Sequence, residues 1–135
     1  MKLRDIFKLP DFILDHQLAY INSSSNPDYD GQNTPTDNLK SAEVILSYTA
    51  ETVDAIDVKK VHRPVLDIDM PVAVLPSSTP GHNHLFIDKE MSWADYEKLL
   101  KVLAEVGIIE KGYLGACRRR GHSAVRLPWV KKEIL

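Results

Sequence analysis

The chain has very little cysteine: one residue, Cys117, among 135. A single cysteine cannot close an intrachain disulfide, and its rarity favours a reducing compartment, so we expect a cytoplasmic protein. The sequence also lacks any apolar run near the roughly 20 residues that a membrane-spanning helix needs. It has no positively charged start followed by an apolar stretch, as signal peptides have. We therefore expect neither disulfides nor a membrane partner.

Several catalytic motifs are missing as well. The sequence contains no GxxxxGK[ST] phosphate loop, no nucleophile elbow and no HExxH pair. These absences argue against a P-loop nucleotide hydrolase, an esterase and a zinc protease. Cys117 and the histidines follow no structural zinc spacing, so we expect Cys117 to be a small buried apolar residue.

Positive charge is concentrated in one segment of a chain whose net charge is −2. Residues 111–132 carry seven Lys/Arg and no acid, whereas residues 1–110 carry ten Lys/Arg and eighteen Asp/Glu. A basic segment on an acidic body is a candidate anion-binding face. The alternative is a solvated hairpin whose arginines pair with the acidic body. A further option is non-specific DNA or RNA binding through residues 111–132, which salt would weaken steeply.

The sequence predicts three parts. Residues 1–21 are mixed and partly apolar, and we interpret them as an N-terminal arm or helix. Residues 22–38 are rich in Ser, Asn, Asp and Pro, which favour a polar, disordered loop. Residues 39–135 form the predicted core domain.

The clearest element of the core is a helix over residues 93–106. Apolar residues recur there at steps of three and four, which makes one apolar face. Ser92 and Asp95 form a capping-box-like pair at its start, and Gly107 is a natural C-terminal cap. Trp93 fits the buried face.

Short β-rich runs surround this helix. We predict strands at residues 63–69, 72–75 and 82–88, with a turn at SSTPG (77–81). The run SAEVILSYTAETVDAIDV has both strand and helix spacing. YLGAC and HSAVRL are predicted to form a hairpin joined through RRRG, with Trp129 in the core. This order predicts an α+β fold, a small antiparallel sheet packed on an amphipathic helix as an RRM-like two-layer sandwich.

Residues 65–69, VLDID, contain the first candidate site. On a strand, Asp67 and Asp69 share one face, and two adjacent carboxylates repel unless a cation or protons lie between them. Such a pair suits Mg²⁺ or Mn²⁺, which accept one or two carboxylates together with substrate phosphates. The alternative is a strand with one solvated face and one buried face.

The run HNHLFID contains the second candidate site. Alternation places His82, His84 and Asp88 on one strand face. The preceding turn, with Ser78, can offer hydroxyls and backbone N–H groups to an anion. The alternative is a pair of surface histidines on an edge strand. RRRGH at residues 118–122 could bind phosphate by charge-assisted hydrogen bonds, or could be an exposed polar turn.

Together, a D-h-D strand, a small-residue turn and an S-x-H-like strand resemble the archaeo-eukaryotic primase and primase-polymerase superfamily, over roughly residues 64–130. The resemblance implies that Asp67 and Asp69 are catalytic acids that bind metal, with Asp88 as a third acid. It implies nucleotide contacts from Ser78 and from His82 or His84. The stretch from LDID to RLPWVKK also resembles small proteins of actinobacterial phages in which SSTPGH-x-HL recurs.

From this resemblance we expect divalent-metal-dependent binding of a nucleotide or nucleic acid by a reduced fold that need not catalyse. The basic side chains that would neutralise phosphates are Arg118, Arg119, Arg120 and Arg126. The alternative is a non-enzymatic phage protein that binds a host protein, with residues 22–38 and the basic run RRRGH (118–122) as recognition surfaces.

Overall fold

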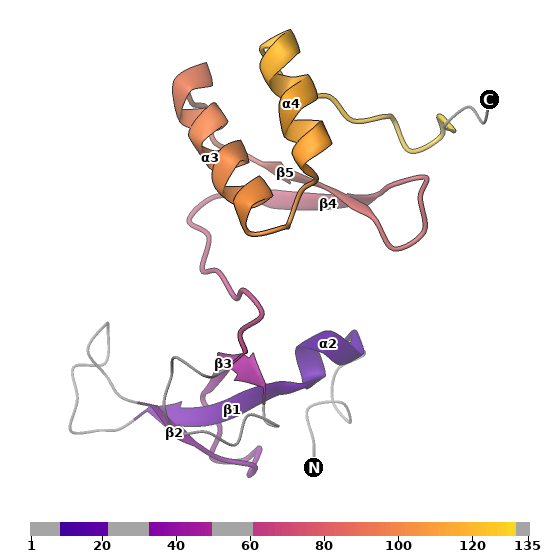
Figure 1. Ribbon diagram of the computed structural model, residues 1–135. Helices are drawn as coiled ribbons and strands as arrows, with labels where there is room; N and C mark the ends of the chain where they lie inside the picture. Colours follow the sequence, from indigo (N-terminus) through magenta and orange to yellow (C-terminus); the bar gives the residue numbers. More distant parts are fainter. Residues whose placement is uncertain (1–8, 22–32, 50–60, 132–135) are drawn as a thin grey trace. The chain divides into compact units, whose positions relative to one another are not determined.

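The computed structural model describes residues 9–21, 33–49 and 61–131 (Figure 1). The chain divides into two compact units, Met1–Asp67 and Ile68–Leu135. The boundary lies inside the segment predicted as one core, residues 39–135. It falls in a stretch, residues 63–71, that forms no helix or strand.

The first unit contains a three-stranded antiparallel sheet in the order β2-β1-β3. Its strands are β1 (His16–Ile21), β2 (Asn33–Pro35) and β3 (Val44–Thr49), and a short helix, α2 (Asp11–Leu14), follows Pro10. β1 lies in the predicted arm and β2 lies in the predicted loop, of which residues 22–32 lie outside the described residues. Pro35 is tolerated because β2 is an edge strand.

The run SAEVILSYTAETVDAIDV, residues 41–58, forms β3 in its first half, and residues 50–58 lie outside the described residues. Val44, Ile45 and Tyr48 are residue types that pack well on a pleated surface, and here that preference outweighs the helical spacing. β3 pairs with β1, where Ala19 is fully buried. The Nδ1 atom of buried His16 lies 2.6 Å from the carbonyl oxygen of Leu46, which adds a side-chain link between β1 and β3.

The second unit begins with the hairpin β4 (Val72–Pro76) and β5 (Asn83–Ile87), which confirms two of the predicted strands. The predicted turn between them is also confirmed. The His82 N–H donates to the Thr79 carbonyl at 3.1 Å, with Pro80 and Gly81 between them. Gly81 has φ +80°, as the third position of a type II turn requires.

The predicted helix is confirmed as α3 (Trp93–Glu105). The Ser92 hydroxyl accepts from the Asp95 N–H at 3.1 Å, as predicted for the cap. At the other end, the Gly107 N–H donates to the Ala104 carbonyl and the Ile108 N–H to the Leu103 carbonyl, at 3.2 and 2.8 Å. With Gly107 at φ +83°, these two bonds are a Schellman motif, which ends α3 and starts the turn to the next helix.

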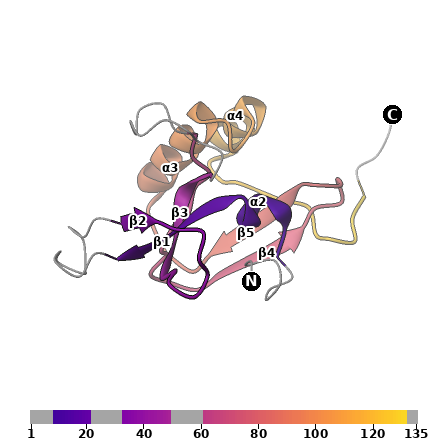
Figure 2. The same ribbon diagram turned by 90° about the horizontal axis from the view of Figure 1, so that it is seen from below.

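The hairpin predicted from YLGAC and HSAVRL is wrong, because residues 111–120 form a helix, α4 (Lys111–Arg120). Leu114 and Cys117, three positions apart, share one face and pack with Leu100 and Ala104 of α3. This burial outweighs the low helix propensity of the two glycines in α4. Cys117 is fully buried, as predicted, and Trp93 packs against this core. Figures 1 and 2 show α3 and α4 next to one another. The hairpin belongs to the same unit.

The predicted α+β class with small antiparallel sheets is confirmed. The RRM-like arrangement stays a prediction. In the parts of the chain that the structure describes, no helix is both long enough and apolar enough to cross a bilayer.

Candidate functional site

Asp67 and Asp69 do not lie on a strand, so the predicted strand over residues 63–69 is wrong. The chain pairs only as far as His62 and Arg63, through a bridge to Tyr48 and a hydrogen bond from the Arg63 N–H to the Ser47 carbonyl. From Pro64 to Met70, the backbone has no described hydrogen-bonded partner. Both residues are exposed, and without a strand the alternation of the sequence does not place their carboxylates on one face.

The hairpin separates the other predicted site residues into two groups. Ser78 and His82 lie at its turn, and His84 lies near that end of β5. Asp88 lies at the open end, where its N–H donates to the Pro71 carbonyl at 2.9 Å. At about 3.4 Å per residue, Asp88 is about 14 Å along the strand from His84 and about 20 Å from His82. One metal ion therefore cannot be shared between the histidines and Asp88.

Among the residues that the structure describes, no three His, Cys, Asp or Glu side chains are close enough to hold one metal ion. A Mg²⁺ that keeps several waters needs only one or two carboxylates. Asp67 and Asp69 have the chemistry for that mode of binding, and they stay a predicted metal pair. Asp88 likewise stays the predicted third acid, and its N–H donates to the carbonyl of Pro71, two residues after Asp69.

The last turn of α4 carries three consecutive arginines, Arg118, Arg119 and Arg120, all exposed. Gly121, at φ +76°, ends the helix, and its N–H donates to the Cys117 carbonyl at 2.8 Å. Positive side chains at a helix C-terminus are favoured by the helix dipole, so part of this arrangement serves stability. Arg118 also pairs with Glu97 of α3 at 3.2 Å. Within the described residues, Arg119 and Arg120 have no acidic partner.

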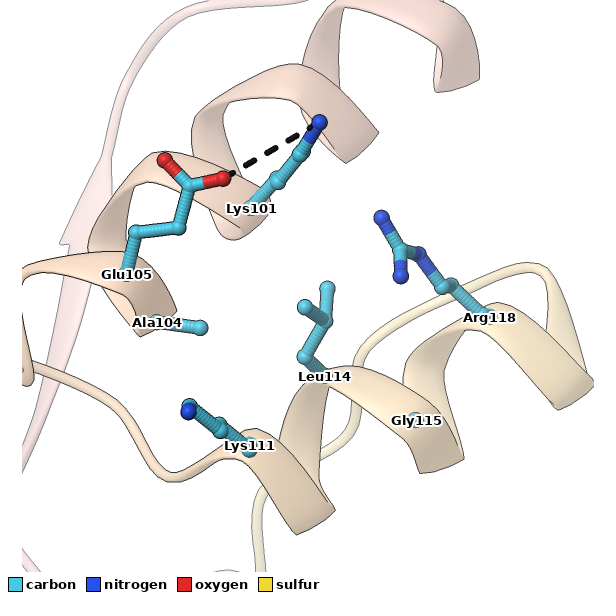
Figure 3. Close-up of a pocket in the computed structure, with 7 residues that line it drawn as sticks. All are labelled: Lys101, Ala104, Glu105, Lys111, Leu114, Gly115 and Arg118. Carbon is cyan, nitrogen blue, oxygen red and sulfur yellow. Dashed lines mark ion pairs between the residues drawn. The ribbon is translucent and has the colours of Figure 1, made fainter.

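A pocket of about 310 Å³ lies between α3 and α4 (Figure 3). Its apolar floor includes Ala104 and Leu114, and three cationic side chains and one carboxylate surround it. The carboxylate, Glu105, lies 3.9 Å from Lys101, so the remaining charge on the lining is positive. The three cationic residues are Lys101, Lys111 and Arg118.

The segment after α4, residues 122–131, contains no helix or strand. Its start is attached to α3, because the hydroxyls of Ser123 and Tyr96 lie 2.6 Å apart. Ser123 also contacts Tyr113 of α4. Partial burial raises the pKa of Tyr113, and the hydrogen bond with Ser123 lowers this pKa by a smaller amount. Further along, the Val130 N–H donates to the Leu127 carbonyl at 3.0 Å, closing a β-turn around Pro128 and Trp129.

Trp129 was predicted to be part of the core, and this prediction is wrong. Its side chain is 75% exposed, the largest value among the exposed apolar residues that the structure describes. The predicted strand that would have buried it does not form, because residues 113–117 belong to α4 and leave residues 122–127 without a partner strand.

A second surface is the β4–β5 hairpin, which contains no charged residue. The cross-strand pairs Val72–Ile87 and Val74–Leu85 lie on one face of the hairpin. All four side chains are 41–58% exposed. An apolar sheet face of this kind is typical of a surface that another element covers.

The outer edge of β5 is open to strand pairing. Bonds from Asp88 to Pro71 and from Ser77 to His82 identify the hydrogen-bonded positions of the hairpin, which alternate along each strand. The intervening N–H groups of β5 therefore point away from β4, and they are those of Asn83, Leu85 and Ile87. No described hydrogen bond occupies the N–H or the carbonyl of Leu85. On β4, Pro76 removes one of the corresponding donors.

Sequence reasoning missed the pocket and the exposed tryptophan. Lys101 and Lys111 come from two helices, and one of these was predicted as a strand. A usable signal for Trp129 was its position after Pro128, because proline is favoured at the second position of a β-turn and the next residue then lies at the third.

Comparison of the chain with protein-family models, with curated proteins and with solved structures finds no match.

Proposed function

We propose that the protein binds nucleic acid through the basic segment, defined as residues 111–131. The observation that carries the proposal is the combination of six Lys/Arg with no acid in this segment, of which only Arg118 has an acidic partner among the described residues. Unpaired arginines at the surface are available for charge-assisted, bidentate hydrogen bonds with phosphate oxygens. The arginines concerned are Arg119, Arg120 and Arg126.

The pocket between α3 and α4 supports the same proposal. Of its three cationic residues, Lys101 and Arg118 are paired with Glu105 and Glu97, so Lys111 of the basic segment is the lining cation without an acidic partner among the described residues. Most nucleic-acid affinity of this kind comes from phosphate contacts and the release of counterions.

The test is the salt dependence of binding to a fluorescent oligonucleotide, for the wild type and for Arg119→Gln/Arg120→Gln. Each lost phosphate contact should flatten the slope of log K against log salt by about 0.7 on a single strand and about 0.9 on a duplex. The matched control is Lys40→Gln/Lys89→Gln, which removes the same charge from exposed positions outside the segment. Equal slopes for all three proteins would contradict the proposal.

We propose the metal-dependent nucleotide site separately from binding by the basic segment. It rests on Asp67 and Asp69 and on the turn with Ser78, His82 and His84, and it does not depend on the basic segment. Its residues supply oxygen ligands and an anion-binding turn.

A second candidate function is binding of a protein partner, a host protein in the phage-protein alternative, by strand addition to β5. The open edge at Leu85 and the apolar face around it favour this mode, in which main-chain hydrogen bonds supply affinity. Affinity capture should lose the partner with Leu85→Lys and keep it with the control Val102→Lys, an exposed apolar position on α3. A partner retained equally by both variants would contradict strand addition.

A further inference from the structure

We infer that the nucleic acid bound by the basic segment is single-stranded, and that Trp129 stacks on one of its bases. This inference rests on the proposed function and specifies its ligand. It depends on a residue outside the charged set, so the two can fail separately.

Trp129 is displayed by a preformed turn. Pro128 occupies the second position, where its fixed φ suits a β-turn, and the Val130 N–H closes the turn on the Leu127 carbonyl at 3.0 Å. The indole follows at the third position and is 75% exposed. Because the turn holds the backbone before any ligand arrives, little conformational entropy is lost when the indole is used for binding.

The surroundings of the indole are positive. Arg126 precedes it by three residues and Lys131 follows it by two, and the arginines of α4 lie upstream with no acid in between. A basic strip with an exposed aromatic ring is the combination by which proteins bind single strands, since the charges follow the backbone and the ring stacks on a base. An indole alone would favour many apolar partners, but the charges around it favour a polyanion with flat aromatic groups.

A duplex fits this arrangement less well. Its base faces are already stacked on one another, and opening a base step for an inserted ring costs a few kcal/mol. In a single strand the base faces are accessible without that cost. Among the described residues of the basic segment, Trp129 is the one exposed Trp, Tyr or Phe, so one stacked base is the number expected for this segment.

The experiment measures binding of labelled oligo-dT and oligo-rU single strands, and of a blunt duplex, by fluorescence anisotropy. Trp129→Ala should weaken single-strand binding by about 5- to 150-fold, the range for loss of one base–aromatic stack. Trp129→Phe should recover most of the loss. The matched control is Leu127→Ala, which removes exposed apolar area from the same turn without an aromatic ring (55% exposed) and should change affinity little.

The salt slope separates the inference from the proposed function. Trp129→Ala should leave the slope unchanged because it removes no charge, while Arg119→Gln/Arg120→Gln should flatten it. Unchanged single-strand affinity in Trp129→Ala, or an equal loss on duplex and single strand, would overturn the stacking inference and leave the arginine result to stand. A wild type that binds neither single strand nor duplex would overturn both.

Discussion

The hydroxyl groups of Tyr96 and Ser123 lie 2.6 Å apart, which joins the first turn of α3 to the start of the segment after α4. Tyr96 also packs edge-on against Trp93, with ring centroids 5.9 Å apart. The segment that carries Arg126 and Trp129 therefore begins at a fixed point on the helix pair. Its position matters for the proposed function because a tethered segment keeps its charges close to those of α4.

Removing this link should weaken the second unit by a measurable amount. Tyr96→Phe and Ser123→Ala should each lower the free energy of unfolding by about 0.5–1.5 kcal/mol, the usual net value of a part-buried hydrogen bond. In the double variant, the loss should be smaller than the sum of the two single losses. Urea unfolding followed by tryptophan fluorescence reports on this unit, because both tryptophans lie in it. Strict additivity would show that the two hydroxyls do not interact.

The small core between α3 and α4 should be sensitive to truncation. Leu100 is 3% exposed and packs with Ala104, Leu114 and Cys117, so Leu100→Ala should lower the free energy of unfolding by about 2–5 kcal/mol. Val102, two positions away and 53% exposed, provides the control, and Val102→Ala should change the free energy by less than about 0.5 kcal/mol. Similar losses for the two variants would mean that α3 does not present the face described above.

Stability should fall at alkaline pH partly because of Tyr113. Burial raises the pKa of its phenol above the usual value of about 10. The folded state therefore holds the phenolic proton more tightly than the unfolded state does. This contribution is fully present below about pH 10 and is lost as pH rises through the raised folded pKa.

The measurement is the free energy of unfolding of the wild type and Tyr113→Phe between pH 8 and 11. The difference between the two proteins should be constant up to about pH 10 and should then change in favour of the variant, since phenylalanine has no proton to lose. Parallel curves over the whole range would exclude a role for Tyr113. Comparing the two proteins removes the effects of lysines and of the other tyrosines.

The parts of the fold that local patterns determine were predicted from the sequence. α3 combines an apolar stripe, the Ser92 cap and Gly107, and these signals agree with one another. The turn at Pro80 and Gly81 is similarly determined by the φ values that the two residues favour. Where several local signals favour the same structure, the sequence predicts that structure without knowledge of tertiary contacts.

α4 and the LDID segment were not predicted, for opposite physical reasons. α4 contains two glycines and a short apolar run, and it becomes a helix because Leu114 and Cys117 are buried against α3. LDID has good strand propensity and alternation, yet no neighbouring strand pairs with it in the described structure. A strand needs a partner for its backbone hydrogen bonds, and no local pattern contains that information.

The residues of the candidate site also differ in whether local sequence could predict them. The four arginines of residues 118–126 could be found from composition alone, because they belong to residues 111–132, which contain seven Lys/Arg and no acid. The exposure of Trp129 could not, because it depends on the absence of a strand that the sequence predicted. The separation of Asp88 from His82 follows from the length of β5, once the register of the hairpin is known.

The predicted metal pair can be tested apart from the basic segment. We expect Mg²⁺ or Mn²⁺ together with a nucleoside triphosphate to raise the Tm of the wild type, and we expect Asp67→Asn/Asp69→Asn to abolish the increase. A ligand at about 100 times its Kd stabilises by about 2.7 kcal/mol, which is several degrees for a unit of this size. Asp11→Asn/Asp37→Asn, which alters two exposed acids elsewhere, should respond as the wild type does.

Each outcome of this thermal-shift series has a distinct structural meaning. An increase lost only in Asp67→Asn/Asp69→Asn would mean that ligand binding organises a segment that has no helix or strand of its own, since the two carboxylates need a common cation to lie together. An increase that survives in this variant and disappears in Arg119→Gln/Arg120→Gln would place the triphosphate on α4, without the acids. No increase in any protein would remove the acids from the candidate site and leave the basic segment with Trp129 as the surface to pursue.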